Sequence, residues 1–517
     1  MSKFYVFIPI QSRQESHDNV LIEHDFKHLW ANYNKKIVTD SETIVFSGFH
    51  FHPKDHSSKD QYLAQILKTK SKETPLHIRG SYAGVYWSRT DAQWLLFTDP
   101  LSTKPLYYAK TKGGWHISND YDSLAKQLSK HQSLEINPLG VYQILCFGYA
   151  LEENTLFSPI KRLPVGTVGI LKTFKTSQVV ASDYDLDIKT LYQLPLETYD
   201  INRDEAAEEV DRLFKQAINR SFSLDKNLGR NHLVSLSGGL DSRMTSWVAH
   251  CLGFRNQTNL TFAQKNSLDK KIAERISRHL NHDWHFLALD GGDILRDMDL
   301  VTQHTGGNVV YYGQAHTRRS LQDIDGTKYG LLHTGMLGDV VLGSYLQNQA
   351  NPAQFNVASG ASSTRFISKL KALGFSPSYP NEEHHKMMLR GLYGMNMGLL
   401  SVYDKTESYS PFTDIDFFDF CMRLPVKMRA NHSLYIHWMK TYYPASTSFI
   451  WERTRANVLS RNITFRSKSM PIKTWVWKLF ERIRFKNTTA NPNFMTPIDY
   501  WLTTEYRLKK DLNDYAK

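Results

Sequence analysis

Between residues 231 and 289 the chain alternates short apolar runs with helical segments, and this alternation constrains its fold more than any other feature. The run HLVSLS is followed by a glycine-rich turn and by a helix expected from about Ser242 to Leu252. The run NLTFA precedes a helix expected over Leu268 to Leu280, and the run WHFLAL follows it. Strands that alternate with helices in this way form a parallel sheet with helices on both faces. This half of the chain therefore predicts an α/β domain of the nucleotide-binding type, with helices added after it.

The part of the chain before about residue 190 has a different pattern. Its short β-branched and aromatic runs, such as GSYAGVYWS, WLLFTD and PLYYA, are separated by Gly, Pro, Ser and Asp at the spacing of antiparallel strands. After a polar stretch from Thr198 to Arg203, the apolar residues recur at helical spacing. This stripe consists of Val210, Leu213, Phe214, Ala217, Ile218 and Phe222. We therefore predict two domains, a strand-rich one over residues 1–195 and an α/β one over residues 200–517.

The composition is typical of a globular protein. Of the 517 residues, 41% are hydrophobic and 22% are charged, which gives ample material for packed cores. The three cysteines, Cys146, Cys251 and Cys421, form no CxxC pair, which excludes a cysteine-rich zinc module and favours a reducing compartment. No window approaches the roughly 18 consecutive apolar residues of a membrane span, and the apolar start from Phe4 to Ile10 lacks a cleavage site. We therefore expect a cytoplasmic protein.

The segment SGGLDS, from Ser237 to Ser242, lies between a predicted strand and a predicted helix, where ligands bind in open parallel sheets. Paired glycines allow a sharp turn at positive φ, and two serine hydroxyls lie beside the N–H groups of a helix N-terminus. These features predict a phosphate cradle. The lysine of the GxxxxGK[ST] loop is absent, and Asp241 beside a phosphate indicates a divalent cation between like charges. The alternative is a tight glycine turn in which Asp241 caps the helix.

SGGLDS resembles the pyrophosphate loop (PP-loop) of the ATP pyrophosphatases, and nearly the whole chain resembles the glutamine-dependent asparagine synthetase family. Further segments match that family's motifs in the right order. They are GSYAG from Gly80, TDP and KPLYY between Thr98 and Tyr108, LPVG from Leu163, TGMLGD from Thr334 to Asp339 with Gly343, and ESYSPFTD from Glu407 to Asp414. The resemblance implies an N-terminal Ntn-hydrolase-like antiparallel sandwich of the glutaminase type 2 and a C-terminal adenine-nucleotide α-hydrolase-like parallel sheet.

The resemblance also implies a two-step ligase reaction that uses ATP and Mg²⁺. ATP adenylates a carboxylate and releases pyrophosphate, and an amine or ammonia then attacks the acyl adenylate to give an amide and AMP. By their place in the motifs, Asp241 and Asp339 would hold the metal. The remaining nucleotide-binding positions would be Ser237, Gly238, Gly239 and Ser242 for pyrophosphate, and Ser235, Ala263, Thr334 and Gly335 for adenosine.

Two catalytic residues follow from the same resemblance. Glu407 would act as the acid or base, with a structural ion pair as the alternative. Lys468 would stabilise the transition state that leads to and from the acyl adenylate, and Arg453 and Arg466 compete with it for that role.

The sequence departs from the family at both of its reactive centres. Ser2 stands where glutamine-hydrolysing members expose a cysteine, and FSGFHFH from Phe46 replaces their Asn-Gly-Glu segment. We therefore expect the first domain to be an inactive structural domain, although an N-terminal serine can act as a nucleophile. Met336 and Val340 replace acids that serve aspartate and ammonia recognition in the synthetase. The acceptor is therefore expected to be another small-molecule or peptide carboxylate, and the donor another amine.

The net charge of +12 leaves other functions open. The segment from Arg453 to Lys486 contains ten Lys or Arg and one acid, which gives +9 in 34 residues. Because SGGxDS also occurs in tRNA-lysidine synthetases, a tRNA-modifying enzyme is one alternative, and a non-catalytic binding protein is another. The first domain has no place in those tRNA enzymes, so we expect no nucleic-acid partner. The sequence leaves open whether the protein forms a homodimer.

Within this basic segment, PIKTWVWKLFERIRFK predicts a helix with an apolar stripe. We expect this stripe, which consists of Trp475, Trp477, Leu479, Phe480 and Ile483, to pack on the second domain. The alternative is a basic amphipathic helix that lies on an anionic membrane.

Overall fold

The computed structural model describes residues 3–9, 21–25, 35–39, 41–51, 59–172, 186–345, 356–465, 468–484 and 494–517. These residues form two compact units. The first comprises Met1–Leu194, Thr302–Tyr311 and Asn351–Glu407, and the second comprises Pro195–Val301, Tyr312–Ala350 and Ser408–Lys517. The main division therefore lies near residue 195. Two later segments, which the sequence analysis assigned to the second domain, pack with the first unit.

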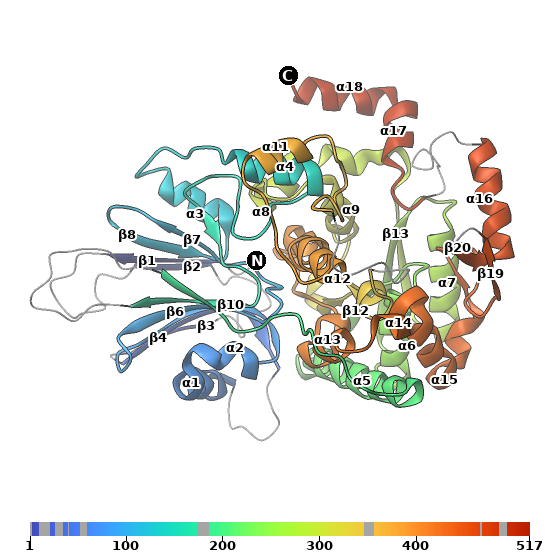
Figure 1. The fold of residues 1–517 in the computed structure, drawn as a ribbon, viewed down its shortest axis with the longest axis horizontal. Helices are drawn as coiled ribbons and strands as arrows, with labels where there is room; N and C mark the ends of the chain where they lie inside the picture. The colour runs from blue at the N-terminus through green and yellow to red at the C-terminus, as the bar shows by residue number, and fades with distance from the viewer. Residues whose placement is uncertain are drawn as a thin grey trace, which may run out of the picture. The chain divides into compact units, whose positions relative to one another are not determined.

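The first unit contains two antiparallel sheets (Figure 1). In the order β2-β1-β8-β7-β9, one sheet consists of Leu21–Asp25, Lys3–Pro9, Gly114–Ser118, Tyr107–Lys110 and Lys161–Arg162. In the order β11-β10-β6-β5-β4-β3, the other consists of Leu186–Thr190, Thr167–Lys172, Gln93–Thr98, Gly80–Ser88, Glu42–His50 and Lys35–Val38. The antiparallel prediction for this part of the chain is confirmed.

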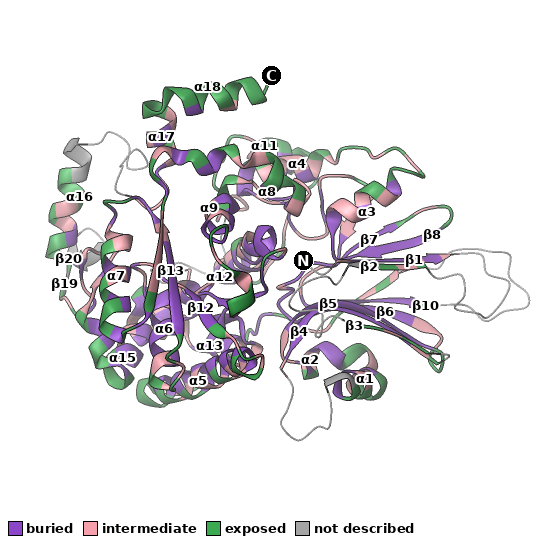
Figure 2. Cartoon of the chain, turned by 180° about the vertical axis from the view of Figure 1, so that it is seen from behind, coloured by how far each residue is buried: buried purple, intermediate pink, exposed green. Residues whose placement is uncertain are grey.

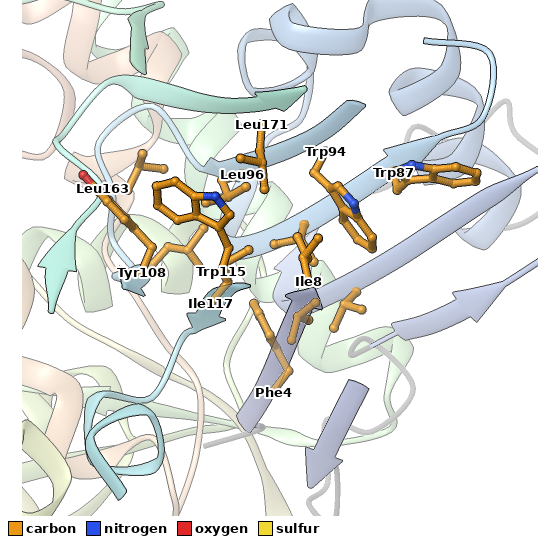
Figure 3. Close-up of a cluster of buried hydrophobic side chains, with 14 of the residues drawn as sticks. Phe4, Ile8, Trp87, Trp94, Leu96, Tyr108, Trp115, Ile117, Leu163 and Leu171 are labelled. Atoms are coloured by element: carbon orange, nitrogen blue, oxygen red, sulfur yellow. The ribbon is translucent and has the colours of Figure 1, made fainter. Parts of the chain in front are cut away.

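The two sheets pack face to face over a core of alternate side chains. Phe4 and Ile8 of β1 point into this core, where Trp94 and Trp115 meet them from the two sheets (Figure 3). Tyr5 lies on the opposite face of β1, as a two-residue strand period requires. That outer face packs against α3 (Tyr121–Leu128), while α1 (Lys59–Lys70) and α2 (Thr74–His77) cover the outer face of the second sheet. The layer order is helix, sheet, sheet, helix.

An apolar cluster explains why residues 351–407 pack with the first unit. Cys146 and Phe147 of α4 (Pro138–Phe147) are buried against side chains from that segment, among them Leu370 and Phe375. The helices of the later segment, residues 351–407, are α11 (Ile367–Ala372), α12 (Glu382–Lys386), η5 (Met387–Leu392) and η6 (Met395–Val402).

The second unit is built on a five-stranded parallel sheet, which confirms the α/β prediction. In the order β14-β13-β12-β15-β16, its strands are Asp283–Ala288, Gln257–Ala263, Asn231–Ser235, Tyr329–His333 and Ser408–Tyr409. The connections β12-α6-β13 and β13-α7-β14 use helices Asp241–Cys251 and Leu268–Leu280, close to the predicted bounds.

Helix α5 (Arg203–Asn227) precedes the sheet and begins where the sequence changes period. Asn202 accepts hydrogen bonds from the backbone of Asp204 and Glu205, and the Glu205 side chain closes a capping box. All six members of the predicted apolar stripe of α5 are buried. The remaining α-helices of the second unit are α9 (Tyr312–Ser320), α10 (Gly338–Val341), α13 (Ile415–Met422), α14 (Val426–Arg429), α15 (Ser433–Tyr442), α16 (Ile472–Arg484), α17 (Ile498–Thr504) and α18 (Tyr506–Tyr515), and α8 (Met298–Thr305) spans both units.

Two short hairpins complete the second unit. β17 (Ile450–Trp451) pairs with β18 (Ala456–Asn457), and β19 (Asn462–Phe465) pairs with β20 (Lys468–Pro471). The other strands of the parallel sheet are largely buried, whereas the edge strand β14 and helices α16 and α18 are mostly exposed or half-buried where they are described (Figure 2). Among the described residues, no helix combines the length and apolarity that a membrane crossing requires.

Candidate active site

SGGLDS leaves the carboxyl end of β12 and enters α6, as predicted. The Ser237 N–H donates to the Ser242 hydroxyl at 3.0 Å, and the two serine hydroxyls lie 3.1 Å apart. The Gly239 N–H donates to the Ser237 hydroxyl at 3.2 Å, and the Gly238 N–H donates to Oδ1 of Asp269 at 3.0 Å. Backbone N–H groups and hydroxyls thus gather in one turn at a helix N-terminus, which is the arrangement that holds a phosphate.

Gly238 is required for space and not for an unusual backbone angle. Neither Gly238 nor Gly239 adopts a positive φ, so our expectation of a left-handed turn at this loop is wrong. A Cβ atom on Gly238 would lie 2.7 Å from Cβ of Glu452 and 3.3 Å from Cα of Asp269. The loop turns with ordinary φ values, and the missing side chain lets two neighbouring segments approach it.

The strand order places this loop at a point where ligands bind. From β12 the chain continues to β13 on one side, whereas β15 lies on the other side of β12. The crevice outside the carboxyl ends of β12 and β15 is therefore the topological switch point of the sheet. SGGLDS follows β12, and the TGMLGD segment follows β15, so the two motifs flank the same crevice.

Tight glycine contacts join these two motifs. A Cβ atom on Gly335 would lie 2.4 Å from the Ser242 backbone nitrogen, and one on Gly338 would lie 2.6 Å from Cγ of Asp241. The Thr245 hydroxyl, on α6, donates to the Thr334 carbonyl oxygen at 3.2 Å. Asp241 and Asp339 are therefore brought to one place from segments that are far apart in the sequence.

Asp241 is half-buried, and the surroundings of its carboxylate fit a cation. Burial and the negative charge of Asp339 raise the pKa of the Asp241 carboxyl well above its usual range. Its Oδ1 atom is buried and has no hydrogen-bond partner among the described residues. Two adjacent carboxylates repel each other unless a positive charge lies between them, and oxygen ligands suit Mg²⁺. The donor set of Asp241 and Asp339 therefore fits Mg²⁺.

The positions assigned to adenosine also meet at this edge. Ser235 and Ala263 are the last residues of β12 and β13, and Thr334 follows β15 directly. The Thr334 N–H donates to the Tyr409 carbonyl oxygen at 2.8 Å, which links the end of β15 to β16. Gly335 comes next in the chain. The carboxyl ends of three neighbouring strands thus supply all four positions.

The segment after β17 brings Glu452 to the SGGLDS loop. No sequence motif predicted this acid. The Glu452 N–H contacts the Gly238 carbonyl oxygen at 3.4 Å. Burial and the charge of Asp269 raise the pKa of Glu452 to about 7, while Arg453 opposes this shift. Burial also raises the pKa of Asp269, and the positive charge of Arg455 opposes it. No motif marked Glu452 or Arg455, because both approach the loop only through the tertiary fold.

Arg243 anchors this segment to the loop. Its guanidinium is fully buried and donates to the carbonyl oxygens of Gly238 at 3.2 Å, Ser446 at 3.1 Å and Ile450 at 2.7 Å. Arg243 follows SGGLDS directly in the sequence, and only this position could have indicated that it contacts the loop.

Three residues, Lys468, Arg453 and Arg466, are candidates for the cation that stabilises the acyl adenylate. Of these, the structure describes the side chain of Arg453. Its charge acts on Glu452, beside Gly238. Lys468 lies in β20, but its side chain falls outside the described part of the chain, as does Arg466 altogether. The roles of Lys468 and Arg466 stay predictions.

Glu407 directly precedes β16 and is buried in an ion pair. Its Oε2 lies 2.5 Å from Nζ of Lys104, and the two side chains are 2% and 1% exposed. The same ammonium group lies 3.8 Å from the centre of the Tyr403 ring. All three residues belong to the first unit. Lys104 comes from the KPLYY motif, so two family motifs contribute to this pair.

The two residues that replace family acids lie in the same crevice segment. Met336 is half-buried, and its carbonyl oxygen accepts from the Ser410 hydroxyl at 2.8 Å. Val340 is buried on α10. Ser2, the residue in place of the glutaminase cysteine, lies outside the described residues.

A second buried cluster, formed by Asp225, His232 and His333, lies on a different part of the sheet. One carboxylate oxygen and one nitrogen from each imidazole lie within 4.8 Å of one another, so these three atoms could also hold a metal ion. Both imidazoles, however, contact the same Oδ2 of Asp225, His232 through Nδ1 at 2.8 Å and His333 through Nε2 at 2.6 Å. Oδ1 accepts from the Leu331 N–H at 2.8 Å. These are hydrogen-bond distances, so we interpret the cluster as a triad that joins α5 to β12 and β15.

Comparisons with known proteins agree with the motifs. Residues 54–184 match the glutamine amidotransferase domain family, and residues 209–443 match the asparagine synthase family. No curated protein matches the sequence.

Several solved structures resemble parts of the chain at low identity. A glutamine phosphoribosylpyrophosphate amidotransferase from B. subtilis, complexed with ADP and GMP, is 9% identical with a TM-score of 0.22, and the match covers 52% of this chain and 60% of that one. An NH3-dependent NAD synthetase from Campylobacter jejuni, in complex with the nitrate ion, is 15% identical with a TM-score of 0.21, and the match covers 39% of this chain and 96% of that one. This chain thus spans less than two thirds of the amidotransferase.

The two matched domain families occur in sequence order, lie on either side of the division near residue 195 and together cover more than half of the chain. The chain therefore combines a domain of the glutamine amidotransferase family with a following domain of the asparagine synthase family.

Proposed function

We propose that this protein is an AMP-forming ligase that adenylates a carboxylate with ATP and joins the acyl group to an amine or ammonia. The observation that supports this most is the pair of Asp241 and Asp339, which the fold brings together beside SGGLDS at the switch point of the sheet. A phosphate cradle with a cation site next to it is what the departure of pyrophosphate requires, since negative charge builds on the leaving group.

Each part of the loop has a proposed task. Ser237, Gly238, Gly239 and Ser242 bind pyrophosphate oxygens, with the N–H groups of Gly238 and Gly239 exchanging their present partners, Asp269 and Ser237, for phosphate oxygens. The N-terminus of α6 favours the negative charge there. Asp241 and Asp339 hold Mg²⁺, which, when bound, neutralises the charge on the departing pyrophosphate. The adenosine lies against the strand ends, at Ser235, Ala263, Thr334 and Gly335.

We further propose Arg453 as a cation for the acyl adenylate, with Lys468 kept as the candidate that the family resemblance supplies. The electrostatic effect of Arg453 on Glu452 supports this choice, because Glu452 contacts the loop at Gly238. Glu407 is proposed as the acid or base of amide formation, and its buried contact with Lys104 gives the alternative structural role a definite partner.

The proposed acceptor is a carboxylate other than aspartate, because Met336 and Val340 are apolar where the synthetase recognises charged groups. The proposed nitrogen source is an amine or free ammonia. Ser2 replaces the cysteine nucleophile, so we expect a glutaminase assay of the full chain to give no hydrolysis above that of a Ser2→Ala variant.

Pyrophosphate exchange tests the proposed function. Labelled pyrophosphate should enter ATP when the protein is given ATP, Mg²⁺ and the right carboxylate from a panel of small acids and peptides. Asp241→Asn should abolish the exchange, whereas Asp325→Asn, a change of the same kind at an exposed turn, should leave it intact. Exchange that persists in Asp241→Asn, or no exchange with any acid of the panel, would count against the ligase.

A further inference from the structure

Helix α16 exposes an apolar face. Ile472, Val476, Leu479 and Phe480 are 58%, 49%, 61% and 66% exposed. They are spaced i, i+4, i+7 and i+8, so at 3.6 residues per turn they form one stripe along the helix. The expectation that the whole apolar stripe packs on the second domain is therefore wrong for Leu479 and Phe480.

The opposite face of α16 holds the helix to its unit. Thr474 is buried, and its hydroxyl donates to the Thr454 carbonyl oxygen. The Trp475 indole N–H donates to the Ile463 carbonyl oxygen at 3.2 Å, and the guanidinium of Arg455 lies 4.0 Å from the centre of the Trp477 ring. Thr474 lies about half a turn away from the apolar stripe, since each residue turns the helix by about 100°. The stripe therefore points away from the unit that anchors the helix.

The neighbouring hairpin enlarges the apolar surface. Ile463 of β19 and Leu459, just before it, are each 47% exposed. Because the Trp475 indole bonds to Ile463, the hairpin β19–β20 and α16 lie side by side, and Figure 1 shows both at the periphery of the second unit. Single exposed apolar residues are common, but a group of six on adjacent elements marks an interaction site.

Positive charge accompanies this surface. Lys473 is exposed and lies beside the stripe, and Arg461 is exposed next to the hairpin, whereas Lys478 is exposed on the side of the helix that carries Thr474. They belong to the segment from Arg453 to Lys486, with its net charge of +9. A second copy of this chain would bring the same positive charge to the interface and be repelled. A nucleic acid would satisfy the charge but would leave the apolar stripe in water.

We propose that the apolar stripe of α16, together with Leu459 and Ile463, forms a docking surface for an anionic membrane, on which α16 lies parallel to the lipid surface. A lipid surface offers both features that this face requires, an apolar layer for the stripe and negative headgroups for Arg461 and Lys473. Lysine stems can cover apolar surface while their ammonium groups reach the headgroups. None of the six apolar residues belongs to the SGGLDS loop, so we expect membrane binding without ATP or turnover.

Vesicle co-sedimentation of the full-length protein tests this proposal. The protein should sediment with phosphatidylcholine vesicles that contain about 30% phosphatidylserine, weakly with pure phosphatidylcholine, and less as salt is added. Leu479→Ser combined with Phe480→Ser should lower binding at least ten-fold. The matched control, Leu373→Ser combined with Tyr506→Ser, changes two other exposed apolar residues and should bind as the wild type does.

Charge reversal separates the electrostatic part. Arg461→Glu combined with Lys473→Glu should abolish the preference for phosphatidylserine, whereas Lys369→Glu combined with Lys371→Glu, at two exposed positions of α11, should preserve it. Circular dichroism checks that each variant folds, and Asp241→Asn should bind vesicles normally even when it is inactive. No binding to anionic vesicles, or a Leu479→Ser/Phe480→Ser variant that loses only self-association, overturns the proposal.

Discussion

Glu407 and Lys104 pose a question at the scale of single residues, because a buried ion pair can be structural or chemical. Removing one partner leaves the other charge buried and unpaired, which typically costs about 3 to 5 kcal/mol. We predict that Glu407→Gln lowers the free energy of unfolding by this amount in a denaturant titration. Adding Lys104→Met should recover much of the loss, since neither charge is then buried. A Glu407→Gln protein that is as stable as the wild type but inactive would show that the carboxylate acts in the chemistry.

Gly238 gives a second prediction at this scale. Because an added Cβ would lie 2.7 Å from Cβ of Glu452, Gly238→Ala should shift the loop and reduce stabilisation by ATP and Mg²⁺ in thermal unfolding. Gly398→Ala is the matched control, because no heavy atom lies within 4 Å of the Cβ it would add. Equal stabilisation of both variants by the nucleotide would refute the close-packing role that we give to Gly238.

Residue patterns predicted part of this site and missed the rest for a physical reason. SGGLDS and Asp339 could be singled out in the sequence because a phosphate cradle and its metal ligands require particular residues at fixed spacing, and their roles stay predictions. Glu452 and Arg455 were missed because the β17–β18 hairpin carries them to the loop, and no local pattern encodes that approach. The backbone conformation of Gly238 could not be predicted either. A glycine in a sequence indicates that a side chain is absent, but it does not show whether the fold requires a positive φ or close packing.

At the scale of elements, the Asp225 triad ties α5 to two strands and makes stability depend on pH. Burial lowers the pKa of His333, so the folded protein keeps this group neutral while the unfolded chain takes up a proton below about pH 6.5. The unfolded state then binds more protons, and stability falls as pH falls. Burial lowers the pKa values of His282, His316 and His432 to about 4, and these groups act in the same direction.

We therefore predict that the free energy of unfolding decreases from pH 7 to pH 5. His333→Gln should reduce the slope of this decrease, even if it lowers stability throughout. Asp225 adds to the loss at lower pH, because its two histidines, against the effect of burial, hold its pKa below the usual value. Denaturant titrations at several pH values measure the slope. A wild type whose stability is constant between pH 7 and pH 5 would contradict the neutral, buried state of these histidines.

The hydrophobic periodicity of the sequence predicted the buried face of a helix correctly where the protein itself covers that face. The apolar stripe of α5 follows from burial on one side, and it was recognised in the sequence. In α16 the same periodicity predicted packing, and Trp475 and Trp477 do contact the second unit, yet Leu479 and Phe480 face outward. The side chain of Ile483 lies outside the described residues. A hydrophobic period shows that a helix has an apolar face, but it does not show whether protein or another medium covers that face.

At the scale of the whole molecule, two domain families account for most of the chain, but the units are not continuous segments. Residues 302–311 and 351–407 pack with the first unit, in part because Cys146 and Phe147 of α4 require apolar partners that this later segment supplies. Such a contact joins residues more than 200 positions apart, and neither composition nor periodicity could reveal it.

The central claim is that SGGLDS, Asp241 and Asp339 form one site for ATP and Mg²⁺. Isothermal titration calorimetry of the full chain with ATP, with and without Mg²⁺, tests it most directly. We predict that Mg²⁺ tightens ATP binding at least ten-fold in the wild type, and that Asp241→Asn and Asp339→Asn each remove this gain while the Asp325→Asn control keeps it. A wild type that binds ATP equally well without Mg²⁺, or an Asp241→Asn protein in which Mg²⁺ still tightens binding, would contradict the account.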